Sequence, residues 1–185
     1  MNLPNFLTLG RIIAVPVVVW LISVGRFQAA FWCFVAAGVT DAVDGYLARR
    51  LNQRTTLGAY LDPLADKALL VSIYVSLGVV GQLPNWLVIL VVSRDLMIVG
   101  AVILSWLLER PVAIRPLFIS KLNTVGQIML AALVLADLGF ALDHSDVVYV
   151  ATLTVGALTL LSAGAYLVQW VRHMTGGDEA AAPGG

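Results

Sequence analysis

Charged residues are scarce in this sequence. Aspartate, glutamate, lysine and arginine make up 12% of the 185 residues, whereas they make up about 25% of a typical soluble domain. Positive and negative charges cancel to a formal net charge of zero. A neutral chain lacks the bulk attraction that draws basic domains to nucleic acid, so we expect no nucleic-acid partner.

Cysteine and histidine are scarcer still. Cys33 is the only cysteine, so no disulfide can form within the chain, and we expect this residue to act as a small buried hydrophobe. The chain has only two histidines besides. A zinc or iron–sulfur site, which needs several cysteine or histidine ligands, is therefore not expected.

Apolar residues, in contrast, dominate. They make up 60% of the chain, and the mean hydropathy is +0.92. A soluble fold of this size could not bury so much apolar surface, so the sequence predicts an integral membrane protein. Six apolar segments are long enough to cross about 30 Å of hydrocarbon. They cover residues 11–25, 27–48, 57–81, 85–108, 117–140 and 146–172.

These segments lack the alternation typical of strands, so helices are expected to span the bilayer. Residues 1–10 mix polar and apolar side chains, which predicts a short amphipathic helix in the membrane interface. Residues 173–185 are rich in glycine, alanine and acidic residues and predict a disordered cytoplasmic tail. The predicted fold is therefore all-α, with an interfacial helix (1–10), a domain of six transmembrane helices (11–172) and a tail (173–185).

The positive charges predict the orientation, because cytoplasmic connections carry an excess of lysine and arginine. The flanking cations are Arg49, Arg50 and Arg54 at the second connection, Arg110, Arg115 and Lys121 at the fourth, and Arg172 after the last span. The opposite side has only Arg26. We therefore expect both termini on the cytoplasmic side.

Four aspartates interrupt two of the apolar segments. Asp41 and Asp44 lie near the end of the second segment, and Asp62 and Asp66 lie near the start of the third, followed by Lys67. An ionisable side chain inside a span is energetically costly and is a functional candidate for that reason. The connection between the segments is short, so we expect two antiparallel neighbouring helices with all four carboxylates at similar depth.

The spacing of the aspartates places each pair on one helical face, at i, i+3 for the first pair and i, i+4 for the second. Four carboxylates in a medium of low dielectric constant repel one another unless some are protonated or cations lie among them. Oxygen ligands favour Mg²⁺, Mn²⁺ or Ca²⁺. On these residues alone, a metal-dependent enzyme and an ion-coupled transporter both remain open.

Small residues accompany the aspartates. Gly45, Ala48 and Gly58 leave room for a ligand to approach the backbone, although small residues also serve close helix packing in membranes. Arg49 is a planar cation suited to phosphate, although an arginine at a span end is also a topology signal.

Taken together, these residues resemble the signature of the CDP-alcohol phosphatidyltransferase family. Its eight fixed positions are Asp41, Asp44, Gly45, Ala48, Arg49, Gly58, Asp62 and Asp66. The resemblance covers about residues 2–172. It implies a membrane enzyme that transfers the phosphatidyl group of CDP-diacylglycerol to an alcohol and releases CMP.

The resemblance also implies roles for these residues. Two Mg²⁺ or Mn²⁺ ions are held by the carboxylates of Asp41, Asp44, Asp62 and Asp66. Asp66 also acts as the general base on the acceptor hydroxyl. The cytidine diphosphate is bound by Gly45, Ala48, Arg49 and Gly58. Family members are commonly homodimers, and the resemblance implies a homodimer in the inner (cytoplasmic) membrane, with its active site on the cytoplasmic side.

Other segments resemble particular branches of the family. Residues 3–11 resemble the amino terminus of both the phosphatidylglycerophosphate synthases and the CMP-forming cardiolipin synthases. Residues 93–95 and 118–124, with Gln127, are closer to the cardiolipin synthases. We therefore expect phosphatidylglycerol as the acceptor, with glycerol 3-phosphate as the alternative. The expected ligands of the acceptor phosphate are Thr8, Arg11, Arg94, Lys121 and Asn123.

Each of these five residues has an alternative role. Thr8 can cap a helix, and Arg11 and Lys121 can anchor the chain at the interface. Arg94 can pair with Asp95 or with an aspartate of a neighbouring span, and Asn123 can simply pack or cap. Lys121 and Asn123 share one phosphate only if the chain is irregular there, because residues two apart on a regular helix do not face the same way. The sequence assigns no role to Asp137.

Overall fold

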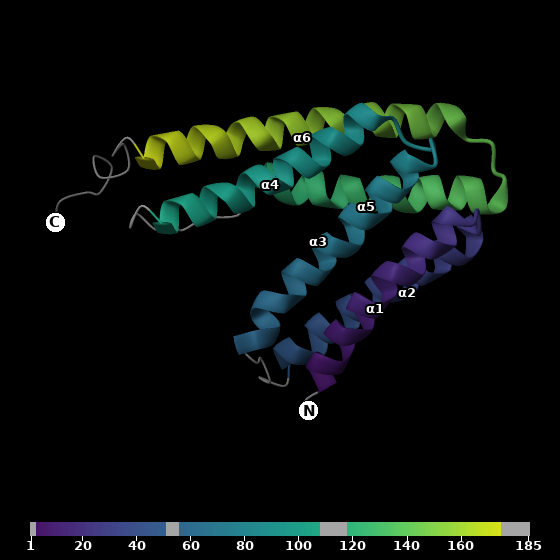
Figure 1. The fold of residues 1–185 in the computed structure, drawn as a ribbon, viewed down its shortest axis with the longest axis horizontal. Helices are drawn as coiled ribbons and strands as arrows, with labels where there is room; N and C mark the ends of the chain where they lie inside the picture. The colour runs from purple at the N-terminus through teal and green to yellow at the C-terminus, as the bar shows by residue number, and fades with distance from the viewer. Residues whose placement is uncertain (1–2, 51–55, 108–117, 175–185) are drawn as a thin grey trace.

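The structure is a computed structural model that describes residues 3–50, 56–107 and 118–174 (Figure 1). Over these ranges the regular secondary structure is entirely helical. The helices are α1 (Leu3–Ser23), α2 (Phe27–Arg50), α3 (Thr56–Val79), α4 (Asn85–Leu107), α5 (Phe118–Phe140) and α6 (Ser145–Met174). The prediction of an all-α protein with about six spans is confirmed.

Among the described residues, three helices are long and apolar enough to cross a membrane, namely Asn85–Ser105, Phe118–Phe140 and Ser145–His173. Shorter apolar stretches occur in the other three, at Ile13–Ser23, Phe27–Thr40 and Lys67–Val79. Large apolar side chains such as Trp20, Ile89 and Leu161 are exposed on the outside of the helices, as expected where the surrounding solvent is lipid.

The first helix joins two predicted segments. Helix α1 is continuous from Leu3 to Ser23, so the described part of the expected interfacial helix (1–10) runs directly into the first predicted span, and its place in the interface stays a prediction. Pro4 lies in the first turn, where proline is tolerated because its missing N–H has no partner there anyway. Gly10 only weakens a helix, by about 1 kcal/mol relative to alanine, and does not break one. The two predicted segments therefore form one helix.

The turns between the helices are set by residues with positive φ. Gly25 (φ 72°) ends α1, and Gly81 (φ 75°) follows α3. Glycine adopts this left-handed conformation without the steric cost of a Cβ atom. In the α5–α6 connection two other residues adopt it, Ala141 (φ 49°) and Asp143 (φ 56°).

Asp137 gains a role in this last connection. Its Oδ1 atom accepts a hydrogen bond of 2.8 Å from the backbone N–H of His144, and the His144 ring lies 3.8 Å from the same oxygen. The carboxylate thus ties the end of α5 to the residue before α6. Asp137 is a structural residue of the turn, which the sequence alone did not indicate.

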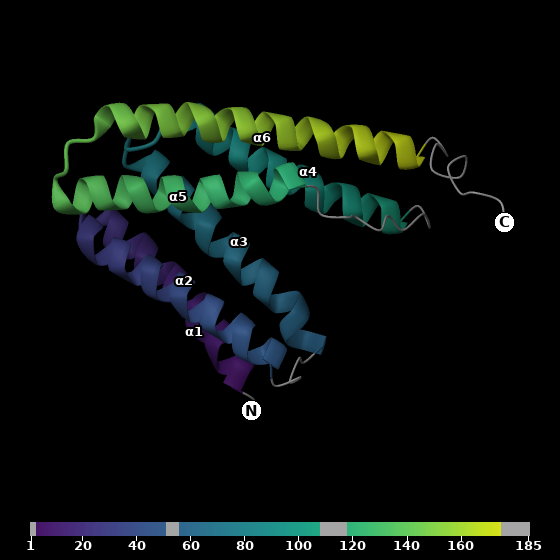
Figure 2. The ribbon, with the colours of Figure 1, turned by 180° about the vertical axis from the view of Figure 1, so that it is seen from behind.

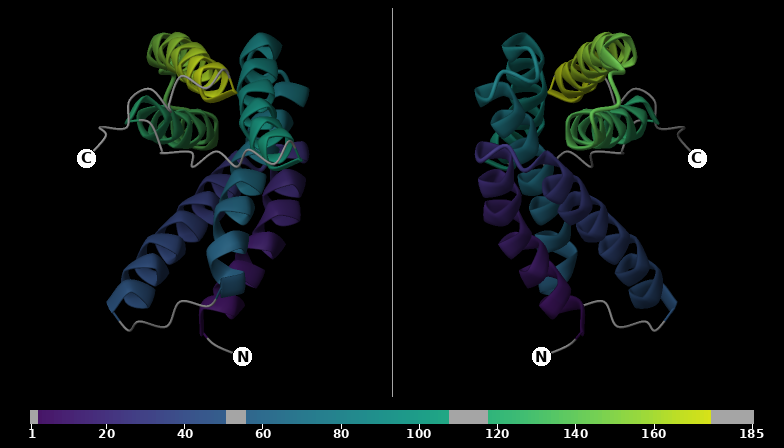
Figure 3. Two further views of the ribbon diagram at one scale, coloured as in Figure 1. Left: turned by 90° about the vertical axis from the view of Figure 1, so that its left-hand side faces the viewer. Right: turned by 90° about the vertical axis from the view of Figure 1, so that its right-hand side faces the viewer.

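The helices form two groups. In Figures 1 and 2, α4, α5 and α6 run roughly along one another, and α1, α2 and α3 are inclined to them. Helix α5 packs against both groups, since it contacts α2 and α3 as well as α6. Figure 3 shows α2 diverging from α3 toward the end of the molecule where α2 finishes.

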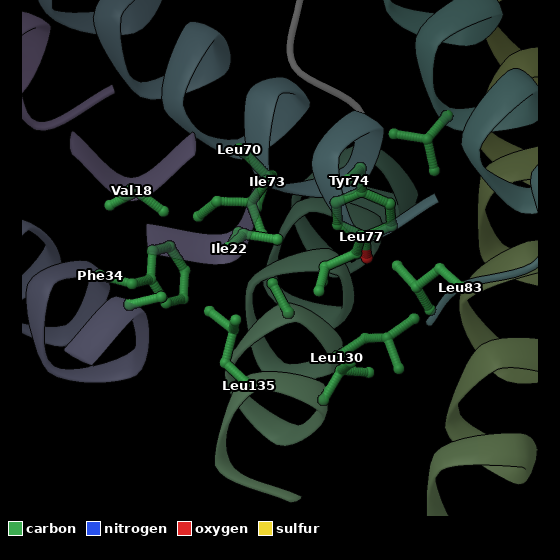
Figure 4. Packing of buried hydrophobic residues seen from close by; sticks show 14 of the residues in the cluster. Val18, Ile22, Phe34, Leu70, Ile73, Tyr74, Leu77, Leu83, Leu130 and Leu135 are labelled. Atoms are coloured by element: carbon green, nitrogen blue, oxygen red, sulfur yellow. The ribbon is translucent and has the colours of Figure 1, made fainter. Parts of the chain in front are cut away.

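The predicted direct packing of α2 against α3 is not found among the described residues. Both helices pack instead against α1. The physical reason is visible in the core (Figure 4), where Phe34 of α2 and Ile73 of α3 converge on Val18 and Ile22 of α1. Over the residues that are described, the apolar faces of α2 and α3 are thus buried against α1 and not against each other.

Candidate functional site

The four aspartates lie on helices, as their spacing predicted. Asp41 and Asp44 belong to α2, and Asp62 and Asp66 belong to α3. Their side chains fall outside the part of the chain whose side chains are described. The same holds for the predicted nucleotide residues Gly45, Ala48, Arg49 and Gly58 and for Thr8 and Arg11. The metal and nucleotide assignments therefore stay predictions.

A charged network begins directly beside these aspartates. Lys67, the residue after Asp66, forms an ion pair with Asp95 of α4 through Oδ1. The same oxygen accepts a hydrogen bond of 2.7 Å from Nη1 of Arg94. Arg94 and Asp95 are only 2% and 8% exposed. Charges at such depth in a membrane protein are stable only with partners, and here each has one.

Arg94 binds the neighbouring helices as well. Its Nε and Nη2 atoms donate to Oγ of Ser162 on α6, at 3.2 and 2.7 Å, and Nη2 also donates to Oγ of Ser120 on α5. The guanidinium carbon lies 5.6 Å from the centre of the Tyr166 ring, a cation–π contact. All three guanidinium nitrogens thus have partners within the protein, which matches the alternative role given to Arg94 above.

Lys121 and Asn123 face different surroundings. Helix α5 is already regular at Phe118, and Lys121 is exposed whereas Asn123 is fully buried. The irregular chain that would let both bind one phosphate is therefore absent at this point. Oδ1 of Asn123 lies 2.8 Å from the hydroxyl of Thr159 on α6.

The Thr159 hydroxyl also lies 2.7 Å from the carbonyl of Val155, but it has only one hydrogen to donate. If the Thr159 hydroxyl donates to the Val155 carbonyl, it can still accept a hydrogen bond. The side-chain amide of Asn123 then takes the flipped orientation, in which Nδ2 donates to that hydroxyl. In either orientation Asn123 joins α5 to α6, which is the packing role stated as its alternative.

A cavity of about 470 Å³ adjoins the charged network. Its polar lining consists of Lys67, Asp95, Thr124 and Gln127. The rest of the lining is apolar or glycine: Phe34, Val35, Ala37, Gly38, Val39, Leu69, Leu70, Ile128 and Ala132. The cavity thus lies among α2, α3, α4 and α5, and it has a wall suited to an apolar group and a few polar groups at fixed positions.

Gln127 is the least expected residue of this cavity. Its side chain is 1% exposed, and its Nε2 atom has no hydrogen-bond partner within the described part of the chain. Its backbone carbonyl accepts a 3.0 Å hydrogen bond from the Tyr74 hydroxyl of α3. A buried amide without a partner costs about 1–3 kcal/mol. Lys67 carried a signal in the sequence, as a cation within a span, whereas Gln127 carried none beyond its place in a matching segment.

Comparison with known proteins places these helices in context. A family model described as CDP-alcohol phosphatidyltransferase matches residues 1–161. A chloroplastic CDP-diacylglycerol–glycerol-3-phosphate 3-phosphatidyltransferase of Oryza sativa is 33% identical over 92% of this chain and 57% of its own length. The CMP-forming cardiolipin synthase of Homo sapiens is 36% identical over 89% of this chain and 60% of its own length.

A third relative is a probable phosphatidylglycerophosphate synthase of Mycobacterium tuberculosis. It is 32% identical over 95% of this chain and 84% of its own length. The chain thus spans a little under two thirds of the rice and human relatives but most of the mycobacterial one. By their names, these relatives belong to both of the branches that the sequence left open, the cardiolipin synthases and the phosphatidylglycerophosphate synthases.

Proposed function

This chain belongs to the CDP-alcohol phosphatidyltransferase family, and on that basis we propose that it transfers the phosphatidyl group of CDP-diacylglycerol to a glycerol-type hydroxyl and releases CMP. The observation that carries the proposal is the eight-residue signature from Asp41 to Asp66, distributed over α2 and α3. The product is an acidic phospholipid, and the enzyme acts within the membrane.

The donor set fits divalent metals. Asp41, Asp44, Asp62 and Asp66 supply only carboxylate oxygens, at i, i+3 and i, i+4 spacing on helices, and such oxygens are the ligands that Mg²⁺ and Mn²⁺ prefer. Two such ions, when bound, neutralise the pyrophosphate and stabilise the attacking and leaving oxygens.

The remaining steps belong to the chain itself. Asp66 accepts the proton of the acceptor hydroxyl, whose oxygen attacks the phosphorus that bears diacylglycerol, and CMP leaves. Arg49 binds the anionic cytidine diphosphate, and Gly45, Ala48 and Gly58 leave room for it. No covalent enzyme intermediate is required, because phosphoryl transfer depends mainly on positioning and charge stabilisation.

We propose phosphatidylglycerol as the acceptor, so that the product is cardiolipin, with glycerol 3-phosphate as the alternative. Glycerol 3-phosphate carries a phosphomonoester with a charge near −2, for which two cations are a natural match. Phosphatidylglycerol carries a phosphodiester with one negative charge. Lys121 is exposed, whereas the neutral Asn123 is buried against Thr159, so this pair offers one cation to an acceptor phosphate. One cation suits the diester better.

The proposed active site, with Thr8 and Arg11 at the start of α1, lies on the cytoplasmic side of the inner membrane. This orientation rests on the distribution of lysine and arginine. We also propose a homodimer, because members of the family are commonly homodimers.

The test is CMP release by the purified protein from CDP-diacylglycerol in the presence of phosphatidylglycerol and Mg²⁺. We expect release from the parent and none from the Asp41→Asn variant, in which a metal ligand is lost. An ion-coupled transporter would release no CMP. Absence of CMP with every alcohol acceptor tried, from a folded preparation, would overturn the proposal.

A further inference from the structure

Gln127 lies between the polar and the apolar part of the cavity described above. On α5 the lining runs from Thr124 to Ala132, which lie about 12 Å apart along the helix axis. The charged network is at the Thr124 end, because it reaches Ser120, one turn before Thr124. Ala132 belongs to the apolar wall. Gln127 is therefore placed where the polar lining gives way to the apolar lining.

The side-chain amide of Gln127 is a buried donor without a partner. The residue is 1% exposed, and its Nε2 atom has no hydrogen-bond partner within the described part of the chain. The amide of Asn123 is satisfied by Thr159 once it takes its flipped orientation, but no described neighbour offers the same to Nε2 of Gln127. Since the two orientations of an amide have the same shape, its N–H₂ group can be turned toward the cavity.

The position of Gln127 also separates it from the signature of α3. Its backbone carbonyl accepts a hydrogen bond from the hydroxyl of Tyr74, a residue about 12 Å farther along α3 than Asp66. A group that binds this amide is therefore not the reacting group of a substrate. It is a part of the substrate that lies farther into the membrane.

From this position we infer that Gln127 is a specificity-determining residue, which recognises the ester linkage of a glycerolipid substrate by donating a hydrogen bond from its side chain to an ester carbonyl. The inference rests on the proposed function, in which the donor and the proposed acceptor both carry a diacylglycerol. It adds a property that the proposed function does not contain, a preference for ester-linked over ether-linked chains.

The chemistry of the linkage matches the position of the amide. In a diacylglycerol the ester groups lie between the headgroup and the acyl chains, as Gln127 lies between the polar and the apolar lining. An ether analogue has a methylene group in place of the ester carbonyl and keeps only a weakly accepting oxygen. It contacts the apolar wall equally well but leaves the buried amide unpaired, and a site built around a buried donor rejects a ligand that lacks the acceptor.

The test compares ester-linked and ether-linked lipids of equal chain length in two arms. In one arm the linkage of phosphatidylglycerol is varied, and in the other that of CDP-diacylglycerol, while the second substrate keeps its esters. We expect the ether analogue to raise the KM about two- to tenfold, the effect of one hydrogen bond, in the arm whose lipid occupies the cavity. The arms therefore identify which of the two substrates Gln127 contacts.

Gln127→Met removes the donor at nearly constant side-chain length. Because the lost amide is buried without a partner, this variant should fold with at least the stability of the parent, and Gln127→Leu is a second variant of the same kind. In both, the KM values for ester and ether lipids should become equal. The matched control is Thr124→Val in the same cavity lining. The Thr124 hydroxyl already donates to the Ser120 carbonyl at 3.1 Å, so this variant should keep the preference of the parent.

Equal KM values for ester and ether lipids in both arms of the parent would overturn the inference, and this is the result expected if the amide binds only a buried water. An ester preference that survives in the folded Gln127 variants would overturn it as well. Failure of the proposed function is distinguishable, because the parent would then release no CMP. The preference is still measurable in that case, as stronger thermal stabilisation of the parent in detergent by the ester lipid than by its ether analogue, which needs no turnover.

Discussion

Lys67 on α3, the residue after the predicted base Asp66, forms an ion pair with Asp95 on α4. Asp95 is also bonded to Arg94, whose guanidinium reaches Ser120 on α5 and Ser162 on α6. These contacts join α3, α4, α5 and α6 directly after Asp66, the last residue of the signature. The ion pair of Lys67 thus ties α3 to α4 at the residue after Asp66.

Asp95→Asn should destabilise the protein strongly. The substitution removes the counter-charge that the described residues give the buried Arg94 guanidinium, and breaking a buried pair in this way costs about 3–5 kcal/mol. We expect a large fall in the thermal unfolding temperature in detergent. The control is Asp143→Asn, the same substitution in the exposed α5–α6 connection, which should have little effect. Equal stability of the two variants would mean that the network does not hold these helices together.

Gly139→Ala should also destabilise the protein, through close contact between α5 and α2. A Cβ atom at this position would lie 2.7 Å from the backbone Cα and N atoms of Gln28, and backbone atoms cannot move aside as a side-chain end can. Gly164→Ala provides the contrast, because nothing lies within 4 Å of its Cβ position. There the substitution should be neutral or stabilising by about 1 kcal/mol. A Gly139→Ala variant as stable as the parent would show that the two helices separate easily.

Activity should depend on a divalent cation. The proposed ligands are four carboxylates, which bind Mg²⁺ and Mn²⁺ and do not favour softer metals. We expect excess EDTA to abolish CMP release and added Mg²⁺ or Mn²⁺ to restore it. Full turnover in EDTA after extensive dialysis would remove the metal assignment.

Asp66→Asn should separate chemistry from binding. As the proposed general base, Asp66 contributes to proton transfer, and loss of such a base lowers the rate by about 10²–10⁴-fold. Binding of a cytidine nucleotide should survive better in this variant than in Asp41→Asn or Asp44→Asn. Turnover and nucleotide affinity are measured on the same preparations. A nearly active Asp66→Asn variant would place the base elsewhere.

The helices could be predicted because their signals are local. The interruption from Gly81 to Pro84 predicted the break between the third and fourth spans, and α4 begins at Asn85 as expected. Gly25 similarly marks the end of α1. In contrast, the continuity of α1 through Gly10 was not predicted, because polar residues before a span indicate an interface but say nothing of a helix break.

Contacts between helices could not be predicted, because they depend on tilt and on which neighbour covers each apolar face. A short connection suggested that α2 and α3 pack together, yet both are buried against α1. The partner of Arg94 was left open for the same reason, since Asp95 and the aspartates of other spans were all within reach. Lys67 and Gln127 became candidates only when the fold placed them in one cavity.

We propose that this chain joins the phosphatidyl group of CDP-diacylglycerol to phosphatidylglycerol. The most direct measurement supplies labelled CDP-diacylglycerol, Mg²⁺ and the purified protein with phosphatidylglycerol and glycerol 3-phosphate at equal concentration, and separates the labelled lipids. We expect labelled cardiolipin, formed with CMP in equal amount. Rapid formation of phosphatidylglycerophosphate with no cardiolipin would contradict the acceptor assignment, and no labelled product with either acceptor would contradict the enzyme assignment itself.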